Sequence, residues 1–421
     1  MDPEKGTAKV EETLLKNGLR GLFCKRMNIL FSIAVFLGLF INSSFGTYLG
    51  IDQLLLGSMS VMVVYFLLLY AKGNISFSDY NNSDAVKILY VGIFIFAVKY
   101  FFDQDFFKDC LSFFVLPMVV SMVLEQMDVG QRTILRRLLL LFFVVECGMS
   151  IYEKLTLTHV FQLNISESEW GILNRESWSF RSEALLGHPL LNAQVVSIIM
   201  VFIVLSESFP VIVRFVLIAL GFVALLCFNA RGAIIVTTLV VFPYMFKITR
   251  TQSKKIRDIF SIIFITSLVF FIYYVSQNDA LGGRLFRGSE LMDGSAQTRL
   301  DAFNFYRYLT SQDLYVGSEN NYLYLTKKLG AGGVENGLIV LIIKYGLVLT
   351  LLSFPLLVKF HYNKLRICYS KMERWMILIV FYIIGIMNPN LSMATIWVFW
   401  LFSYYAFRPL NVLFQQRGRF V

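Results

Sequence analysis

The chain has 421 residues, of which 57% are hydrophobic and 16% charged, and its mean hydropathy is +0.65. A soluble domain of this length carries far more polar surface, so the composition excludes an ordinary soluble protein and favours a helical membrane protein. The net charge of +10 does not indicate nucleic-acid binding, because the basic residues stand in short segments between apolar runs. That distribution is typical of charges that orient a membrane protein.

The sequence gives no sign of a metal or cofactor site. The five cysteines are scattered, without the spacing of a metal site or a disulfide framework. No P-loop, dinucleotide fingerprint or HExxH motif is present, so we expect neither metal nor cofactor. We also expect no cleavable signal peptide, because residues 1–26 are polar and the first apolar run is long enough to stay as an anchor.

Apolar stretches recur along the whole chain and predict about twelve transmembrane helices in a single membrane domain over residues 1–421. The expected spans are 27–45, 53–71, 86–102, 109–124, 138–152, 185–206, 211–228, 232–248, 259–276, 336–358, 375–389 and 392–407. Several are shorter than the usual ~20 residues. The expected fold class is all-α, a polytopic integral membrane protein with both termini on the same side.

The basic residues orient these helices. Segments 247–258 and 359–374 each contain five Lys or Arg residues, which places both segments and both termini in the cytoplasm. Two long loops, 153–184 and 277–335, are then extracytoplasmic, and long loops in compact membrane proteins are usually functional. In the second loop, apolar residues at three-residue spacing over 298–309 predict a short helix at the membrane surface.

Five arginines fall on the outer side in this topology, where Lys and Arg are normally scarce. They are Arg181, Arg231, Arg284, Arg287 and Arg299. A guanidinium group contacts phosphate through two parallel hydrogen bonds, so the cluster favours a bound anion such as a lipid-linked pyrophosphate. The alternatives are an Arg181 that reaches to the membrane interface, an Arg231 that contacts lipid headgroups, and solvated charges in the loop.

Other polar residues add candidates beside the arginines. His188 stands seven residues after Arg181, so a continuous helix would place both on one face; the alternative is that His188 caps the following helix. Glu335, before Asn336 at the outer mouth of a span, is a candidate general base unless it only caps the helix. Lys344 lies roughly 13 Å deeper, where a charge binds phosphate or pairs with an acid.

Three short stretches, each of which contains or follows an arginine, occur in order along the chain. Residues 187–193 (GHPLLNA) follow an arginine, and residues 229–233 (NARGA) form a turn between spans. The third stretch runs from residues 295–299 (SAQTR) to Glu335-Asn336, which Gly346 follows after nine residues. Over about residues 180–350, these stretches resemble the O-antigen ligase and polymerase superfamily of bacterial envelope biogenesis.

The resemblance implies an all-helical (GT-C-like) glycosyltransferase in the bacterial cytoplasmic (inner) membrane, with its active site on the periplasmic face. Ligases of this superfamily have a histidine at the position of Glu335, so the departure favours a polymerase of O-antigen or exopolysaccharide repeat units. The resemblance to such polymerases implies an enzyme that uses undecaprenyl-pyrophosphate-linked oligosaccharides, needs no metal and inverts the anomeric centre. The expected catalytic residues are Glu335, Arg231 and Arg299, and the expected substrate-binding residues are Arg181, His188, Arg284, Arg287, Asn336 and Lys344.

Two alternatives stay open. One is an O-antigen ligase, which transfers finished glycan to lipid A core or to protein. The other is a membrane transporter or flippase, although such proteins commonly show two related halves and no internal repeat is evident here. The expected partners are the lipid-linked oligosaccharides, membrane lipids and a chain-length regulator protein, and not nucleic acid.

Overall fold

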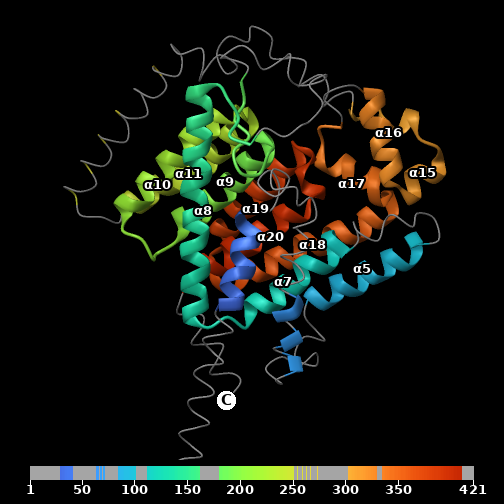
Figure 1. Cartoon of the computed structure of the whole chain (residues 1–421), viewed down its shortest axis with the longest axis horizontal. Helices are drawn as coiled ribbons and strands as arrows, with labels where there is room; N and C mark the ends of the chain where they lie inside the picture. The colour runs from blue at the N-terminus through green and yellow to red at the C-terminus, as the bar shows by residue number, and fades with distance from the viewer. Residues whose placement is uncertain are drawn as a thin grey trace, which may run out of the picture.

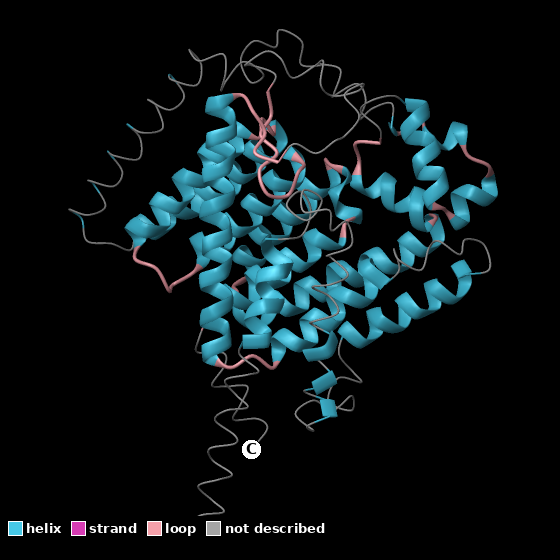
Figure 2. Cartoon of the chain, viewed as in Figure 1, coloured by secondary structure: helices cyan, strands magenta, loops and turns pink. Residues whose placement is uncertain are grey.

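The computed structural model describes residues 29–40, most of 63–71, 84–100, 111–161, 180–250, 302–329 and 334–409, with single helical positions between 254 and 273. These residues are predominantly helical and include no strand (Figures 1 and 2). The expected all-α fold class is therefore confirmed for this part of the chain.

The helix α9 (Pro189–Leu205) lies at the centre of the bundle. All 17 of its residues are buried, and apolar residues occupy every face of the helix, as expected for a helix enclosed by other helices. Around it pack α10 (Val211–Cys227), α11 (Arg231–Arg250), α19 (Lys371–Ile386) and α20 (Ala394–Phe407), as Figure 1 shows. The earlier elements α5 (Asp84–Tyr100), η1 (Leu111–Val115) and α7 (Leu116–Glu125) extend the bundle on another side.

Two expected spans differ in form from the helices that the structure shows. α8 (Val129–Thr156) begins inside the expected loop 125–137, because Asp128 and Gln131 form a capping box there. The expected span 336–358 is broken at Gly346 into α17 (Gly337–Tyr345) and α18 (Leu347–Cys368). α18 then continues through most of the loop that the basic residues predicted at 359–374.

The break at Gly346 has a local cause. Its φ is +82°, and a side chain there would overlap the carbonyl of Tyr315, which belongs to α15 (Ser311–Val316). Gly317, with φ +67°, approaches from the other chain segment, and a Cβ on it would lie 2.8 Å from the Ile343 oxygen. The backbone N–H of Ser318 donates to that same Ile343 oxygen over 2.8 Å. Only glycine permits this close backbone approach at positive φ.

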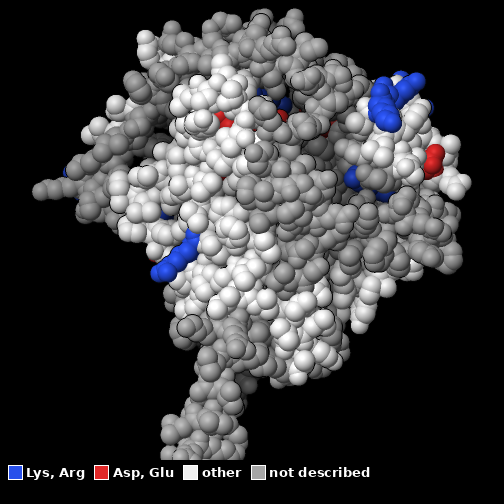
Figure 3. Space-filling model, viewed as in Figure 1, with Lys and Arg blue, Asp and Glu red and all other residues white. Residues whose placement is uncertain are grey.

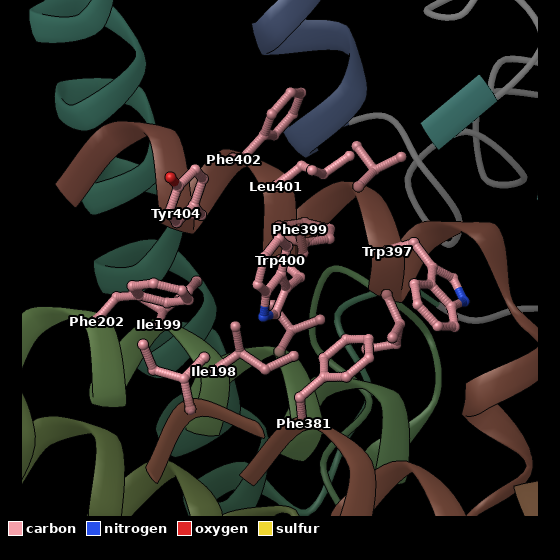
Figure 4. Packing of buried hydrophobic residues seen from close by; sticks show 14 of the residues in the cluster. Ile198, Ile199, Phe202, Phe381, Trp397, Phe399, Trp400, Leu401, Phe402 and Tyr404 are labelled. Carbon is pink, nitrogen blue, oxygen red and sulfur yellow. The ribbon is translucent and has the colours of Figure 1, made fainter. Parts of the chain in front are cut away.

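The core beside α9 is rich in aromatic rings. The rings of Trp400 and Tyr404 stack with centroids 5.5 Å apart, and Phe202 of α9 lies edge-on to Trp400 at 6.2 Å (Figure 4). His361 enters from α18 with its ring centre 3.9 Å from that of Trp400, and its Nδ1 lies 3.0 Å from the hydroxyl of Tyr382. That hydrogen bond satisfies a polar ring inside an apolar core.

The expected surface helix over 298–309 lies partly outside the described residues. Of those described, Ala302 is helical and Phe305–Tyr308 form a 3-10 turn, η2, while Phe303 and Tyr306 are 57% and 52% exposed. Further along, α16 (Glu319–Leu329) packs against α17, with Leu325 beside Ile339 and Ile343 in a small second core. The apolar residues of this loop therefore cover α17.

Among the described helices, α11 alone is both long and apolar enough to cross a membrane. Shorter apolar helices cover residues 29–40, 113–125, 189–205, 211–227 and 394–407. α8 and α18 are longer, at 28 and 22 residues, but contain charged residues along part of their length.

Candidate functional site

The segment 180–188, which contains the first predicted arginine, is not helical and is held against the end of α8. Buried Glu153 accepts hydrogen bonds from three backbone N–H groups: that of Val160 at 2.9 Å, of Glu183 at 2.7 Å and of Ala184 at 3.0 Å. Glu146, about two turns earlier in α8, accepts from the backbone N–H of Leu185 at 3.1 Å. Two carboxylates of α8 thus fix the backbone conformation of this segment.

Further contacts anchor the start of the segment. The ammonium group of buried Lys154 donates to the carbonyl of Phe180 over 2.7 Å, and the hydroxyl of Ser182 donates to the carbonyl of Ser150 over 2.7 Å. Arg181 lies between these two anchored residues, so its backbone position is well defined.

Arg181 reaches from this segment to the end of α10. Its Nε donates to the carbonyl oxygen of Phe228 over 3.3 Å, and the neighbouring N–H of Ser182 donates to the carbonyl of Cys227 over 3.1 Å. Phe228 opens the tight turn that continues through Asn229, at φ 55°, to Arg231 at the start of α11. The structure thus brings Arg181 to the turn that bears Arg231. A cation at a helix C-terminus also has a favourable interaction with the helix dipole.

His188 is placed differently from the expectation. A continuous helix from Arg181 to His188 is wrong, because Ala184 and Gly187 both have positive φ, 42° and 70°. His188 is the N-cap of α9, yet its side chain makes no capping hydrogen bond and its buried Nδ1 has no partner. The two side chains nevertheless remain close enough for Arg181 to repel a charge on His188.

The helices that follow Glu335 and begin at Arg231 pack against a common corner, formed by residues 385–392 at the end of α19 and in η3 (Pro389–Ser392). Next to Arg231, Gly232 faces this corner, and a Cβ on it would lie 2.6 Å from the Met387 methyl carbon. Two residues after Glu335, Gly337 also packs there, and a Cβ on it would overlap the Gly385 carbonyl and lie 2.6 Å from that of Asn388. Both candidate elements thus meet one α19–η3 corner.

Asn336 has a structural role at this position. Its Oδ1 accepts the backbone N–H groups of Leu338 and Ile339, both at 3.1 Å, and so caps α17. Glu335, immediately before this cap, is half-buried. Its carboxylate does not provide the cap, which the alternative interpretation had assigned to it.

Lys344 does not join this group. It lies in the last turn of α17, and its Nζ is 4.7 Å from the ring centroid of Tyr322 in α16. α17 is continuous from Gly337 to Tyr345, so Lys344 lies near its far end, and the expected single span is broken only after it, at Gly346. Arg284, Arg287 and Arg299 lie outside the described residues.

A charged trio that the sequence did not single out adjoins Arg181. The Nδ1 of His159 is 3.8 Å from Glu153 Oε2 and 3.9 Å from Glu183 Oε2, and its ring stacks on Phe180 at 4.8 Å. Burial lowers the pKa of His159, but the two carboxylates outweigh it and raise the pKa above its usual value. Burial raises the pKa of Glu183, and the charge of Glu153 acts in the same direction. In the view of Figure 3, acidic and basic side-chain atoms lie close together near the top of the molecule.

Buried amides form a second group that sequence reasoning missed. Asn192 donates to the Glu183 carbonyl, and Gln194 donates to the Phe381 carbonyl over 3.1 Å, but the side-chain oxygen of each has no partner. Asn390 in η3 is fully buried, and neither of its side-chain atoms has a partner. The sequence signal that could have found them is an Asn or Gln within an apolar segment, because polar side chains there are costly and usually functional.

In the part of the chain that the structure describes, no group of three or more His, Cys, Asp and Glu residues could hold a metal ion. No family model matches the chain, and no curated protein matches it significantly.

Proposed function

We propose that the protein is a polytopic membrane protein with about twelve spans, located in the bacterial cytoplasmic (inner) membrane. Large apolar side chains on the outer faces of several helices support this proposal. Leu155 of α8 is 80% exposed, Leu239 of α11 70%, Leu351 of α18 65% and Val216 of α10 60%. Soluble monomers rarely expose large contiguous apolar surface, whereas lipid covers such faces at no cost.

Within this topology, the protein acts as a repeat-unit polymerase of O-antigen or exopolysaccharide. The observation that carries the proposal is the approach of Arg181 to the turn before Arg231. The proposed topology puts this end of the bundle on the extracytoplasmic side. Two guanidinium groups from separate segments supply the positive charge and the paired donors that recognise a pyrophosphate. The undecaprenyl chain of the substrate would lie in the lipid beside the apolar helix faces.

The reaction is a single displacement. A hydroxyl of the lipid-linked acceptor sugar attacks the anomeric carbon of the donor glycan, and a new C–O bond forms. The bond from that carbon to the pyrophosphate oxygen breaks, and undecaprenyl pyrophosphate leaves with the bonding electrons. The proton of the hydroxyl passes to the Glu335 carboxylate, and the anomeric centre is inverted.

The arginines act on the leaving group. Negative charge grows on the pyrophosphate as the bond breaks, and preorganised donors stabilise it more than they stabilise the ground state. In this proposal Arg181 and Arg231 supply such donors at the turn between α10 and α11, and Arg299 with Arg284 and Arg287 in the loop 277–335 would complete them. Removal of one donor of this kind lowers kcat by about 10²–10³ in well-studied enzymes.

The test is chain elongation by the purified protein in detergent, with an undecaprenyl-pyrophosphate-linked repeat unit as the sole sugar substrate. We expect the wild type to form longer lipid-linked glycans without a nucleotide sugar and without added metal. Glu335→Gln keeps the size of the side chain and removes the base, so its elongation rate should fall at least about a hundredfold. Arg307→Ala, which changes an exposed loop arginine, should elongate normally.

Two other outcomes would overturn the proposal. Transfer of an intact glycan to lipid A core, without elongation, would indicate a ligase. Movement of the lipid-linked repeat unit across proteoliposomes, with no change in glycan length in detergent, would indicate a flippase. Unchanged elongation by Glu335→Gln would remove Glu335 from the mechanism.

A further inference from the structure

A second cluster of basic residues lies at the opposite end of α8, where it meets the ends of α18 and α20. Arg132 of α8 is 3% exposed, and Arg408, directly after α20, is 5% exposed. The Nε of Arg132 donates to the Ala406 carbonyl over 3.4 Å, and the guanidinium carbon of Arg408 is 5.3 Å from the Tyr405 ring centroid. Along α8, roughly 30 Å separates Arg132 from Glu153, so this cluster is distinct from the candidate polymerase site.

Several buried donors of this cluster have no partner. They are Nη1 and Nη2 of Arg132, Nε of Arg408 and the hydroxyl of Tyr369. Tyr369, in the turn between α18 and α19, interacts electrostatically with both arginines, so the three side chains lie close to one another. Unsatisfied donors are rare in folded proteins, and three neighbouring side chains that share the defect point to a missing acceptor.

Among the residues that the structure describes, the nearby acids do not supply that acceptor. Glu125 pairs with Lys364, and Asp84 accepts a hydrogen bond from Asn363 over 2.6 Å. Glu373 is engaged by the hydroxyl of Tyr244 over 2.5 Å. These carboxylates already have partners of their own, so the two guanidinium groups keep an excess of positive charge.

The excess charge is unfavourable without a ligand. Burial, followed by the charges of Arg408 and Arg136, lowers the pKa of Arg132 to about 10. An arginine remains protonated at neutral pH even so, and a buried unpaired cation destabilises the fold. An oxyanion with several acceptor oxygens would satisfy the donors and cancel the repulsion at once.

We propose that Arg132, Arg408 and the Tyr369 hydroxyl bind a phosphate group. On the proposed topology this end of the bundle faces the cytoplasm, where phosphate is available as the headgroup of anionic lipids and as free phosphate or pyrophosphate. Both sources present the same chemistry to two guanidinium groups. The site requires no glycosyltransferase activity, so it stands or falls independently of the proposed function.

The experiment uses the full-length protein in a neutral detergent and in nanodiscs. Inorganic pyrophosphate should raise the midpoint of thermal unfolding in detergent. In native mass spectrometry, nanodiscs of phosphatidylglycerol should leave at least one retained lipid, and those of phosphatidylcholine none. Retention of phosphatidylglycerol that pyrophosphate does not displace identifies the lipid source, and pyrophosphate stabilisation without lipid retention identifies the soluble source.

Variants locate the site. Arg132→Gln and Arg408→Gln should each weaken anion binding at least about tenfold, because each removes charge-assisted hydrogen bonds. Tyr369→Phe keeps the buried ring and removes only the hydroxyl, so it tests the site in a protein that folds. Arg137→Gln, on the exposed side of the same helix, should bind as the wild type does.

Two results would overturn the proposal. One is a wild-type protein that binds neither pyrophosphate nor phosphatidylglycerol. The other is anion binding that is equally strong in Arg132→Gln, Arg408→Gln, Tyr369→Phe and the wild type, which would place the anion elsewhere.

Discussion

Arg181 and Phe228 are 47 positions apart in the sequence, and the Nε of the first donates to the carbonyl oxygen of the second over 3.3 Å. This contact brings an arginine from the segment before α9 to the turn that leads into α11, whose first residue is Arg231. The carbonyl belongs to a helix end, where a positive charge is favoured.

Glu153 should be essential for the shape of the candidate site. Its carboxylate accepts hydrogen bonds from three backbone N–H groups, two of them two and three residues after Arg181. Glu153→Gln replaces one acceptor oxygen by a donor and should destabilise the protein by about 1–3 kcal/mol, with lower elongation activity. Thermal unfolding in detergent measures the loss. Glu207→Gln, at an exposed position, is the control and should leave the midpoint unchanged.

His159 should make stability depend on pH above about 6.5. The carboxylates of Glu153 and Glu183 raise its pKa in the folded protein above its ordinary value of 6.5. The resulting stabilisation is fully present below about pH 6.5 and is lost as the pH rises through the folded pKa. His159→Phe keeps the stack on Phe180 but cannot titrate, so its unfolding midpoint should fall less between neutral and mildly alkaline pH. Identical pH profiles would exclude this ion pair as a source of stability.

Gly346 should tolerate no side chain. Its φ of +82° and the carbonyl of Tyr315 beside it both oppose a Cβ. Gly346→Ala should destabilise by more than the roughly 1–2 kcal/mol of the left-handed conformation alone, because the α17–α18 break must also open. Gly148→Ala is the matched control within a helix: a Cβ there meets nothing within 4 Å, and we expect a gain of about 0.5–1 kcal/mol. Chemical or thermal unfolding of both variants gives the comparison.

Gly337 and Gly232 face the same corner but should respond differently to alanine. At Gly337 a methyl group meets the rigid backbone of Gly385 and Asn388, so it should push Glu335 away from the α19–η3 corner. At Gly232 it meets the flexible end of Met387, which can move. We therefore expect Gly337→Ala to abolish most elongation and Gly232→Ala to retain it at near wild-type yield. Equal activity of the two variants would contradict the placement of Glu335 at this corner.

The apolar runs predicted most of the helices because helix formation in an apolar segment depends on local sequence. The break at Gly346 was not predictable, since it depends on Tyr315 and Gly317 approaching from another segment. The sequence also left open a continuous helix between Arg181 and His188. It does not form, because carboxylates of α8 that stand 31 and 39 positions before the residues they contact hold this backbone in another conformation.

The candidate site was predictable only in part. Arg181 and Arg231 could be singled out because the predicted topology places their positive charges on the outer side, where Lys and Arg are normally scarce. Glu153 and His159 gave no such signal, because a carboxylate and a histidine at a loop boundary are common on any surface. Their importance arises from contacts with the segment 180–188, which the sequence does not reveal.

The role of the outer arginines is most directly tested by the equilibrium dissociation constant for undecaprenyl pyrophosphate, measured on purified wild type and on Arg231→Lys. Lysine keeps the positive charge and loses the planar fork, so the account predicts binding at least about tenfold weaker, with Arg181→Lys similarly impaired and Arg307→Lys unchanged. Equal dissociation constants for Arg231→Lys and the wild type, in well-folded protein, would contradict it.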